Sequence, residues 1–230
     1  MLKAGKRKKP MLIILIIIVV LVAVVIGVFA KIQYEQAKMQ PLNTGEIIPG
    51  IFAINNNFVN FFLIEREGKY IAIDAGNNNT KTIDELQKLG KSPDDVIAVF
   101  LTHTHGDHTS ALSLFTNAAV YVGESTTLRN ISYTVLSDSE IINVLITPIQ
   151  CIFTPGHTKN SVSYLVDGKY LFVGDNLSLR GNQVELFNSF YNNSNEVQTA
   201  SIEKLALIEG VQYIITAHYG FTENVLFKSR

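Results

Sequence analysis

The hydrophobic pattern begins with one long block near the start of the chain. From Met11 to Ala30 the sequence reads MLIILIIIVVLVAVVIGVFA, a run of 20 residues with no charged, amide or proline side chain. At 1.5 Å of rise per residue, a helix of this length is about 30 Å long, which matches the hydrocarbon core of a bilayer. A lone apolar segment in lipid satisfies its backbone hydrogen bonds only as a helix. Residues 11–30 are therefore predicted to form one transmembrane helix.

The charges on either side of this block predict its orientation. Residues 1–10 contain five bases and no acid, whereas residues 31–46 carry both signs of charge. An excess of Lys and Arg stays on the cytoplasmic side of a membrane. We therefore expect a basic cytoplasmic tail over 1–10, a single-pass anchor in the cell membrane, and a catalytic domain outside the cytoplasm. A cleaved signal peptide, which would leave a secreted protein, stays open, although its apolar region normally covers about 7–15 residues.

After the long apolar block, the hydrophobic pattern changes to many short apolar runs. Residues 31–46 are polar and include Pro41 and Gly45, so we predict a short stalk. From Ile47 onward, short apolar runs alternate with turn sequences, which is typical of β-strands. Two pairs of runs are predicted as hairpins: Phe58–Glu65 with Tyr70–Asp74, and Ser161–Val166 with Tyr170–Val173. Further strands are predicted at Val96–Leu101, at Ala119–Val122, within Ile141–Phe153 with a break near Pro148, and at Val211–Thr216.

Helical spacing is confined to three segments. Thr80–Leu89 has apolar residues at three-residue intervals, with Thr80 as the predicted N-cap. His108–Phe115 is predicted as a short helix. The clearest amphipathic pattern covers Glu196–Ile208, and its predicted apolar face consists of Val197, Ala200, Ile202, Leu205 and Ile208. Many strands interrupted by a few helices predict a layered α/β domain.

Composition narrows the classes of function. Hydrophobic residues make up 47% of the chain, enough for a sizeable core, which excludes general disorder. The chain has 19 Lys and Arg against 20 Asp and Glu, and 14 of those bases remain once the five in residues 1–10 are subtracted. Because phosphate backbones require clustered positive charge, no nucleic-acid partner is expected. The single Cys151 excludes an internal disulfide framework and is interpreted as a buried packing residue.

All five histidines follow predicted strands. Three of them lie in the run HTHGDH at 103–108, directly after a predicted buried strand, and the other two and one aspartate follow later strands. Alternate residues of an extended chain point to the same side, and Gly106 allows the chain to turn. Imidazole and carboxylate suit zinc, and also iron or manganese. The candidate metal ligands are His103, His105, Asp107, His108, His157, Asp175 and His218.

The run HTHGDH matches the HxHxDH motif of the metallo-β-lactamase-fold hydrolase superfamily. The chain also resembles this family at its first, third, fourth and fifth motifs, which fall in the same order at Asp74, His157, Asp175 and His218. The resemblance covers about residues 47–226. It implies that 47–230 form a hydrolase domain with a four-layer αββα sandwich fold, and that the metal site lies at one edge between the two sheets.

The resemblance further implies how two zinc ions are bound. The implied ligands are His103, His105 and His157 for the first ion, Asp107, His108 and His218 for the second, and Asp175 as a bridge between them. Asp74 is implied to be a supporting residue rather than a ligand. A single ion, with the second set of ligands partly filled, stays open as an alternative, as do iron and manganese.

A pair of divalent ions suggests a mechanism. Two such ions share a water and lower its pKa from about 15.7 to roughly neutral, and the bridging hydroxide then attacks a carbonyl or phosphorus atom. Asp107 is expected to orient this hydroxide and to carry a proton. Arg180 is a candidate contact for a substrate carboxylate or phosphate, and Tyr219 for an oxyanion. A solvated loop arginine and a packing tyrosine are the alternatives at these two positions.

The substrate is the least determined property. We expect a zinc-dependent hydrolase of a small ester, thioester, lactone or amide. In the resembling family, Asp175 favours the glyoxalase-II-like and lactonase-like branches over β-lactam hydrolases, which often lack this aspartate. Glyoxalase II has a C-terminal helical domain, which we do not expect in a chain that ends at Arg230, soon after His218.

Two hypotheses from other classes stay open. One is a single-iron dioxygenase similar to persulfide dioxygenases, which would use His103, His105 or His157, and Asp175. The other is an anchored binding protein without catalysis. The oligomeric state is not predicted.

Overall fold

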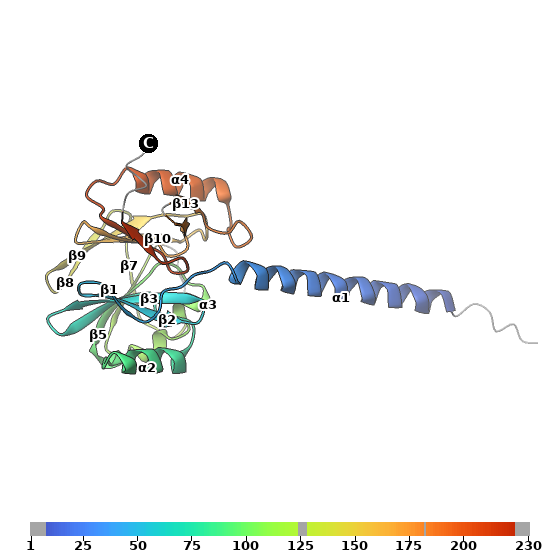
Figure 1. Cartoon of the computed structure of the whole chain (residues 1–230), viewed down its shortest axis with the longest axis horizontal. Coiled ribbons are helices and arrows are strands. Elements are labelled where there is room, and N and C mark those ends of the chain that lie inside the picture. Colours follow the sequence, from blue (N-terminus) through green and yellow to red (C-terminus); the bar gives the residue numbers. More distant parts are fainter. Residues whose placement is uncertain (1–7, 124–127, 182, 224–230) are drawn as a thin grey trace, which may run out of the picture. The chain divides into compact units, whose positions relative to one another are not determined.

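The structure is a computed structural model that describes residues 8–123, 128–181 and 183–223 (Figure 1). The chain divides into two compact units, residues 1–39 and residues 40–230. Of the predicted basic tail at 1–10, residues 1–7 lie outside the described part.

The first unit contains the helix α1 (Lys8–Gln36). Its segment Pro10–Gln36 is long and apolar enough to cross a membrane, with a mean hydropathy of 3.8 in its most apolar window. An N-terminal signal sequence has the same properties, so the helix alone does not distinguish the two. The helix continues past Ala30, and the first six residues of the predicted stalk are therefore helical. The reason is local, because no proline or glycine interrupts the chain between residues 31 and 36.

The second unit begins with a seven-stranded sheet in the order β1-β2-β3-β4-β5-β6-β7. Its strands are β1 (Gly45–Ile48), β2 (Ile51–Asn56), β3 (Val59–Arg66), β4 (Lys69–Ile73), β5 (Val96–Leu101), β6 (Ala119–Val122) and β7 (Thr134–Val135). The first four strands are antiparallel neighbours, and β4 to β7 are parallel. The hairpin of β3 and β4 confirms the first predicted pair of runs, and its turn uses positive φ angles at Glu67 and Gly68.

The second sheet has six strands in the order β15-β14-β11-β10-β9-β8. Its strands are β8 (Ile141–Val144), β9 (Thr147–Phe153), β10 (Val162–Val166), β11 (Tyr170–Phe172), β14 (Tyr213–Ile215) and β15 (Phe221–Glu223). The hairpin of β10 and β11 confirms the second predicted pair. The predicted break near Pro148 is misplaced: the chain turns at Leu145, whose φ is 55°, and Pro148 lies within β9 opposite Asn143. A separate hairpin pairs β12 (Leu177–Arg180) with β13 (Gln183–Leu186).

The helices differ from the predictions in detail. The helix α2 (Asn79–Lys88) is capped by Asn78, whose side-chain oxygen accepts from the Lys81 N–H, and not by Thr80. The predicted helix at 108–115 is split into α3 (Gly106–Thr109) and the 3₁₀ turn η2 (Leu112–Leu114). It is split because the Ala111 N–H donates to the Gly76 carbonyl. A second 3₁₀ turn is η1 (Pro93–Asp95).

The helix α4 (Asn195–Ala206) begins within one residue of its predicted start, and its predicted apolar face is confirmed in part. Leu205 is buried, and Ile202 and Ile208 pack against the same core. Val197 and Ala200 are exposed, and Gln198 and Ser201 are buried in their place. Two of the three buried side chains are polar, and both make hydrogen bonds to the backbone of neighbouring loops.

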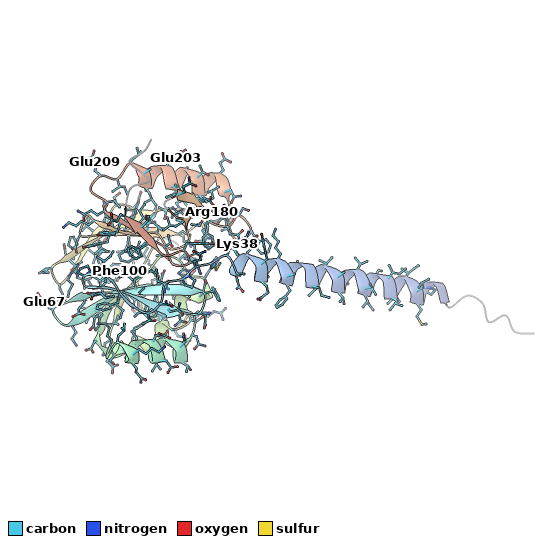
Figure 2. All side chains as sticks on the ribbon, in the orientation of Figure 1. Lys38, Glu67, Phe100, Arg180, Glu203 and Glu209 are labelled. Carbon is cyan, nitrogen blue, oxygen red and sulfur yellow. The ribbon has the colours of Figure 1, made fainter. Side chains whose placement is uncertain are left out.

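The two sheets stack face to face between helices, as Figure 1 shows, with α2 on one outer side and α4 on the other. The central core joins residues of both sheets, such as Ile64 and Phe100 (labelled in Figure 2) with Tyr164 and Phe172. Two outer cores lie under the helices: one contains Leu86 of α2 and the other contains Leu205 of α4. These three layers of contact confirm the four-layer αββα sandwich. Cys151 is fully buried in the central core, and burial raises the pKa of its thiol to about 12.

Candidate metal centre

The structure brings all seven predicted ligands together. They lie after the C-terminal ends of β5, β9, β11 and β14, or on α3, which directly follows β5. Each side chain offers one ligand atom, and these atoms form two groups in which all lie within 4.8 Å of one another. We call them the first ligand set (His103, His105 and His157) and the second ligand set (Asp107, His108 and His218), with Asp175 grouped with the second.

Asp175 lies between the two sets and presents one carboxylate oxygen to each. Its Oδ2 is 3.4 Å from Nε2 of His157 and 3.9 Å from Nε2 of His103. Its Oδ1 is 3.2 Å from Nε2 of His218 and 3.3 Å from Nε2 of His108. This two-sided arrangement is what a carboxylate that bridges two cations requires.

The donor atoms fit metal ions better than they fit one another. Among the described residues, Nε2 of His103, His108 and His218 and Oδ1 of Asp175 are buried atoms with no hydrogen-bond partner. A buried polar atom without a partner costs about 1–3 kcal/mol, so four at one place call for a common ligand. Neutral imidazole nitrogens together with carboxylate oxygens are the donor set of zinc, iron and manganese sites. The residues present therefore fit one or two divalent cations.

Four of the histidines are held through their other ring nitrogen. Nδ1 of His108 lies 2.8 Å from Oδ2 of Asp74, and Nδ1 of His218 lies 2.7 Å from the Phe58 carbonyl oxygen. Nδ1 of His103 lies 3.2 Å from the Thr102 hydroxyl oxygen, and Nδ1 of His157 lies 3.2 Å from Oδ1 of Asn192. Such contacts fix the tautomer that carries the proton on Nδ1, and they leave the Nε2 lone pair free for a metal.

The Asp74 carboxylate is in neither group of candidate ligand atoms, but it contacts residues beside both. Its carboxylate accepts from the Thr102 backbone N–H, from the Thr102 hydroxyl and from Nδ1 of His108. Its own backbone has a φ of 63°, a conformation that non-glycine residues rarely adopt. One buried carboxylate thus ties the end of β5, which leads into the first ligand set, to a histidine of the second set.

Gly174 allows the segment that carries Asp175 to pack closely against the end of β5. Gly174 has a φ of 52°, and a Cβ at that position would lie 2.5 Å from the Thr102 hydroxyl oxygen. Only a residue without a side chain lets the end of β11 pack so closely against the end of β5. Gly174 therefore helps to place Asp175 between the two ligand sets.

The charges of the site differ between the two sets. Burial, reinforced by neighbouring histidines, holds the pKa of His103 well below its usual value, and burial also lowers the pKa of His157. Burial acts in the same direction on His108 and His218, but surrounding carboxylates outweigh it. The pKa of His108 is raised well above its usual value, and that of His218 is raised to about 9. Burial would raise the pKa of Asp175, yet these two histidines hold it well below its usual range.

The two predicted substrate contacts have different surroundings. The Arg180 side chain (labelled in Figure 2) is 77% exposed, and its Nε lies 3.6 Å from Oε1 of Glu185 across the β12–β13 hairpin. Its ion pair is therefore with this exposed hairpin and not with the ligand sets. The Tyr219 ring lies 6.0 Å from the ring of Phe187, which is itself 5.0 Å from His157 and 5.7 Å from His218. Tyr219 therefore contacts the aromatic ring that packs against one histidine of each ligand set.

Several residues at the site were not predicted from the sequence. They are Thr102, Phe58, Phe187, Asn192 and Gln198, which contact ligands through hydrogen bonds or ring faces. Thr102 alone had a local signal, because it immediately precedes the HxHxDH run. Asn192 lies in a polar loop that resembles other asparagine-rich loops of this chain.

Comparisons with known proteins relate this chain to one superfamily. Residues 54–127 match the family model of the metallo-beta-lactamase superfamily. A hydroxyacylglutathione hydrolase of Buchnera aphidicola is 31% identical over 135 residues, which are 57% of this chain and 51% of that protein. A probable metallo-hydrolase of Methanocaldococcus jannaschii is 28% identical over 152 residues, covering 65% of this chain and 71% of that protein. The chain spans about half the length of the hydroxyacylglutathione hydrolases it matches first.

Solved structures share the architecture at low identity. A subclass B3 metallo-beta-lactamase with an active-site glutamic acid superimposes with a TM-score of 0.63 at 15% identity, covering 84% of this chain and 87% of that one. A metallo-beta-lactamase family protein from Thermus thermophilus gives a TM-score of 0.61 at 19% identity, covering 78% and 77%. The chain thus has the metallo-β-lactamase fold, and its residues 54–127, which include the HxHxDH run, carry the sequence pattern of the metallo-β-lactamase superfamily.

Proposed function

We propose that this chain is a membrane-anchored hydrolase that uses two divalent metal ions, zinc in the first instance, to cleave a small ester, thioester, lactone or amide outside the cytoplasm. The observation that supports it best is the position of Asp175, with one carboxylate oxygen toward each ligand set. The unpartnered Nε2 atoms of His103, His108 and His218 around it are three further donors for such ions. The similarity to hydroxyacylglutathione hydrolases makes an acyl thioester the first substrate class to try.

The proposed metal ligands would be the two sets and Asp175. When bound, two divalent cations polarise a substrate carbonyl and activate water as a nucleophile. Burial opposes ionisation of Asp107, but His108 and His218 outweigh it and lower the pKa of its carboxyl group, which stays ionised at neutral pH. Its Oδ2 lies 3.4 Å from Nε2 of His218 and its side chain is 20% exposed. Asp107 can therefore orient a water by accepting a hydrogen bond from it.

The opening of the site is defined by burial. His105 is exposed and Asp107 is partly exposed, whereas His103, His108, His157 and His218 are buried. A substrate therefore approaches from the side of His105 and Asp107. Phe187, which packs against one histidine of each set, closes another side and excludes water there.

The anchor is supported by sequence and structure together. The helix α1 has the length and hydropathy of a membrane span, and the bases of residues 1–10 favour a cytoplasmic N-terminus. Removal by a signal peptidase is the competing outcome. Recovery of a chain with its N-terminus near residue 31 from expressing cells would contradict the anchor.

The test of the hydrolase is metal content together with a substrate panel. The full chain, purified in detergent and loaded with zinc, is expected to contain two zinc ions and to cleave at least one of a thioester, a lactone, an ester or a β-lactam. Asp175→Asn should lower activity by roughly 10²–10³-fold, because one bridging oxygen becomes a neutral amide. The matched control Asp84→Asn, at an exposed position of α2, should leave activity unchanged. Two bound zinc ions without any cleavage, or one iron with consumption of oxygen, would contradict the proposal.

A further inference from the structure

The side-chain amides of Gln198 and Asn192 link two residues of the candidate metal site, His157 and Asp175. Gln198 on α4 is completely buried, although it occupies the middle of an otherwise exposed stretch of helix. Its Nε2 donates to the backbone carbonyl of Asp175 at 3.1 Å and lies 3.2 Å from Oδ1 of Asn192. The same Oδ1 lies 3.2 Å from Nδ1 of His157. The contacts therefore run from His157 through Asn192 and Gln198 to Asp175.

Every donor and acceptor of these two amides has a partner. The Gln198 amide nitrogen has two protons and two acceptors, the Asp175 carbonyl and Asn192 Oδ1. The Asn192 amide nitrogen has two protons and three acceptors within reach: Gln198 Oε1 at 2.7 Å, and the Phe187 carbonyl and Asn195 Oδ1, both at 2.9 Å. Oδ1 of Asn192 has two lone pairs and receives the Gln198 and His157 protons. A network in which every member is satisfied holds its geometry, whereas a partly satisfied one does not.

The backbone is built around the same contact. Gly156, next to His157, has a φ of 139°, and a Cβ there would lie 2.4 Å from Cα of Gln198. The Ser194 N–H donates to the Gly156 carbonyl, and the Asn193 N–H donates to the His157 carbonyl. The loop that carries His157 therefore lies directly against α4 at Gln198, and no side chain fits between them.

We propose that Gln198 is a positioning residue that, through Asn192, fixes His157 of the first ligand set relative to the bridging Asp175. This inference rests on the proposed metal site and goes beyond it, because neither amide is a ligand. Asn192 holds the proton on Nδ1 of His157, so that Nε2 faces the metal position. Gln198 fixes the backbone of Asp175 through the hydrogen bond to its carbonyl oxygen. One buried side chain of α4 thereby positions both His157 and Asp175.

The test uses cobalt in place of zinc, because cobalt reports coordination by its visible absorption. In the full chain in detergent, Gln198→Met keeps the length of the side chain and removes its hydrogen bonds. We expect cobalt affinity at the first ligand set to fall about tenfold, the visible spectrum of that site to change, and kcat to fall more than KM rises. Asn192→Ala should act in the same way, and the double variant should be no worse than the more severe single variant, because the two residues act as one unit.

Ser201→Ala is the matched control on the same helix. Ser201 is buried and donates to the Pro155 carbonyl, but it lies outside the amide chain. It should lower the melting temperature without changing the cobalt spectrum. An unchanged spectrum in Gln198→Met, an equal change in Ser201→Ala, or additive effects in the double variant would overturn the inference. If Gln198→Met does not fold, Asn192→Ala, at a partly exposed loop position, decides by the same spectrum. A wild-type chain that binds no metal would instead contradict the proposed function.

Discussion

The first ligand set (His103, His105 and His157) and the second (Asp107, His108 and His218) differ in what surrounds their ring nitrogens. In the first set, neutral partners, the Thr102 hydroxyl and the Asn192 amide, face the second ring nitrogens of His103 and His157. In the second set, His108 lies against Asp74, Asp107 and Asp175. The same residue type therefore has a lowered pKa in one set and a raised pKa in the other.

This difference shows that a carboxylate near a ligand has two opposite effects. It makes the imidazole a stronger donor to a metal, and it also makes the imidazole a stronger base toward protons. The second ligand set must lose protons before it binds a cation at neutral pH. In the first set, burial already favours the neutral forms of His103 and His157. We therefore expect the first set to fill first and the second set to respond to pH.

The largest expected effect is that pH dependence. The pKa of His218 is raised to about 9 and that of His108 lies well above its usual value, so protons compete with a cation for the second set. Binding to the second set then releases protons, and competition from the His218 proton alone should lower the affinity of this set about tenfold for each unit of pH below about 9. Burial lowers the pKa of His103 and His157, so affinity at the first set should depend less on pH over the same range. Zinc titration calorimetry in buffers of different ionisation enthalpy measures the protons released at each step. Equal proton release at both steps would remove the distinction.

A smaller effect is expected when the support of one set is changed. Asp74→Asn replaces the carboxylate that faces Nδ1 of His108 by a neutral amide. We expect zinc affinity at the second set to fall by about 10–100-fold, and affinity at the first set to change much less. Competition with a chromogenic chelator gives both constants, and thermal melting shows whether the fold survives. Asp84→Asn is again the matched control. A larger loss at the first set would mean that Asp74 acts mainly through Thr102.

The smallest effect concerns the segment that precedes β1. The Gln40 N–H donates to the His218 carbonyl at 2.8 Å, and the Leu42 N–H donates to the side chain of Asn60. The Asn60 N–H in turn donates to the Ala217 carbonyl. A chain that starts at residue 37 should therefore keep both metal affinities, whereas one that starts at residue 44 should lose a few-fold in affinity at the second set, about 1 kcal/mol for a lost hydrogen bond. If the chain that starts at residue 37 and the chain that starts at residue 44 bind zinc with equal affinities, this role of residues 40–42 is contradicted.

The sequence predicted strands and helices correctly where a short stretch of the chain determines them by itself. The strands at 96–101 and 119–122 coincide with β5 and β6, since a short apolar run bounded by polar residues has few alternatives. The face of α4 was predicted only in part, because Gln198 and Ser201 are buried by hydrogen bonds to distant loops while Val197 is exposed. The N-cap of α2 was displaced by two residues, because threonine and asparagine both make good caps and only the structure shows which one bonds.

For the site, the positions of predicted strand ends were enough to name the seven ligand candidates, because strand ends that meet at one edge of a sandwich bring their following residues together. Asp74 was named only through the resemblance to the family. The long apolar run likewise predicts its helix without help from any other segment. Sequence could not identify what holds the ligands: His218 contacts a carbonyl 160 residues away, and His157 contacts an amide 35 residues away. Those contacts are decided by how the two sheets and α4 pack, and a hydrogen bond between distant segments leaves no periodic trace in the chain.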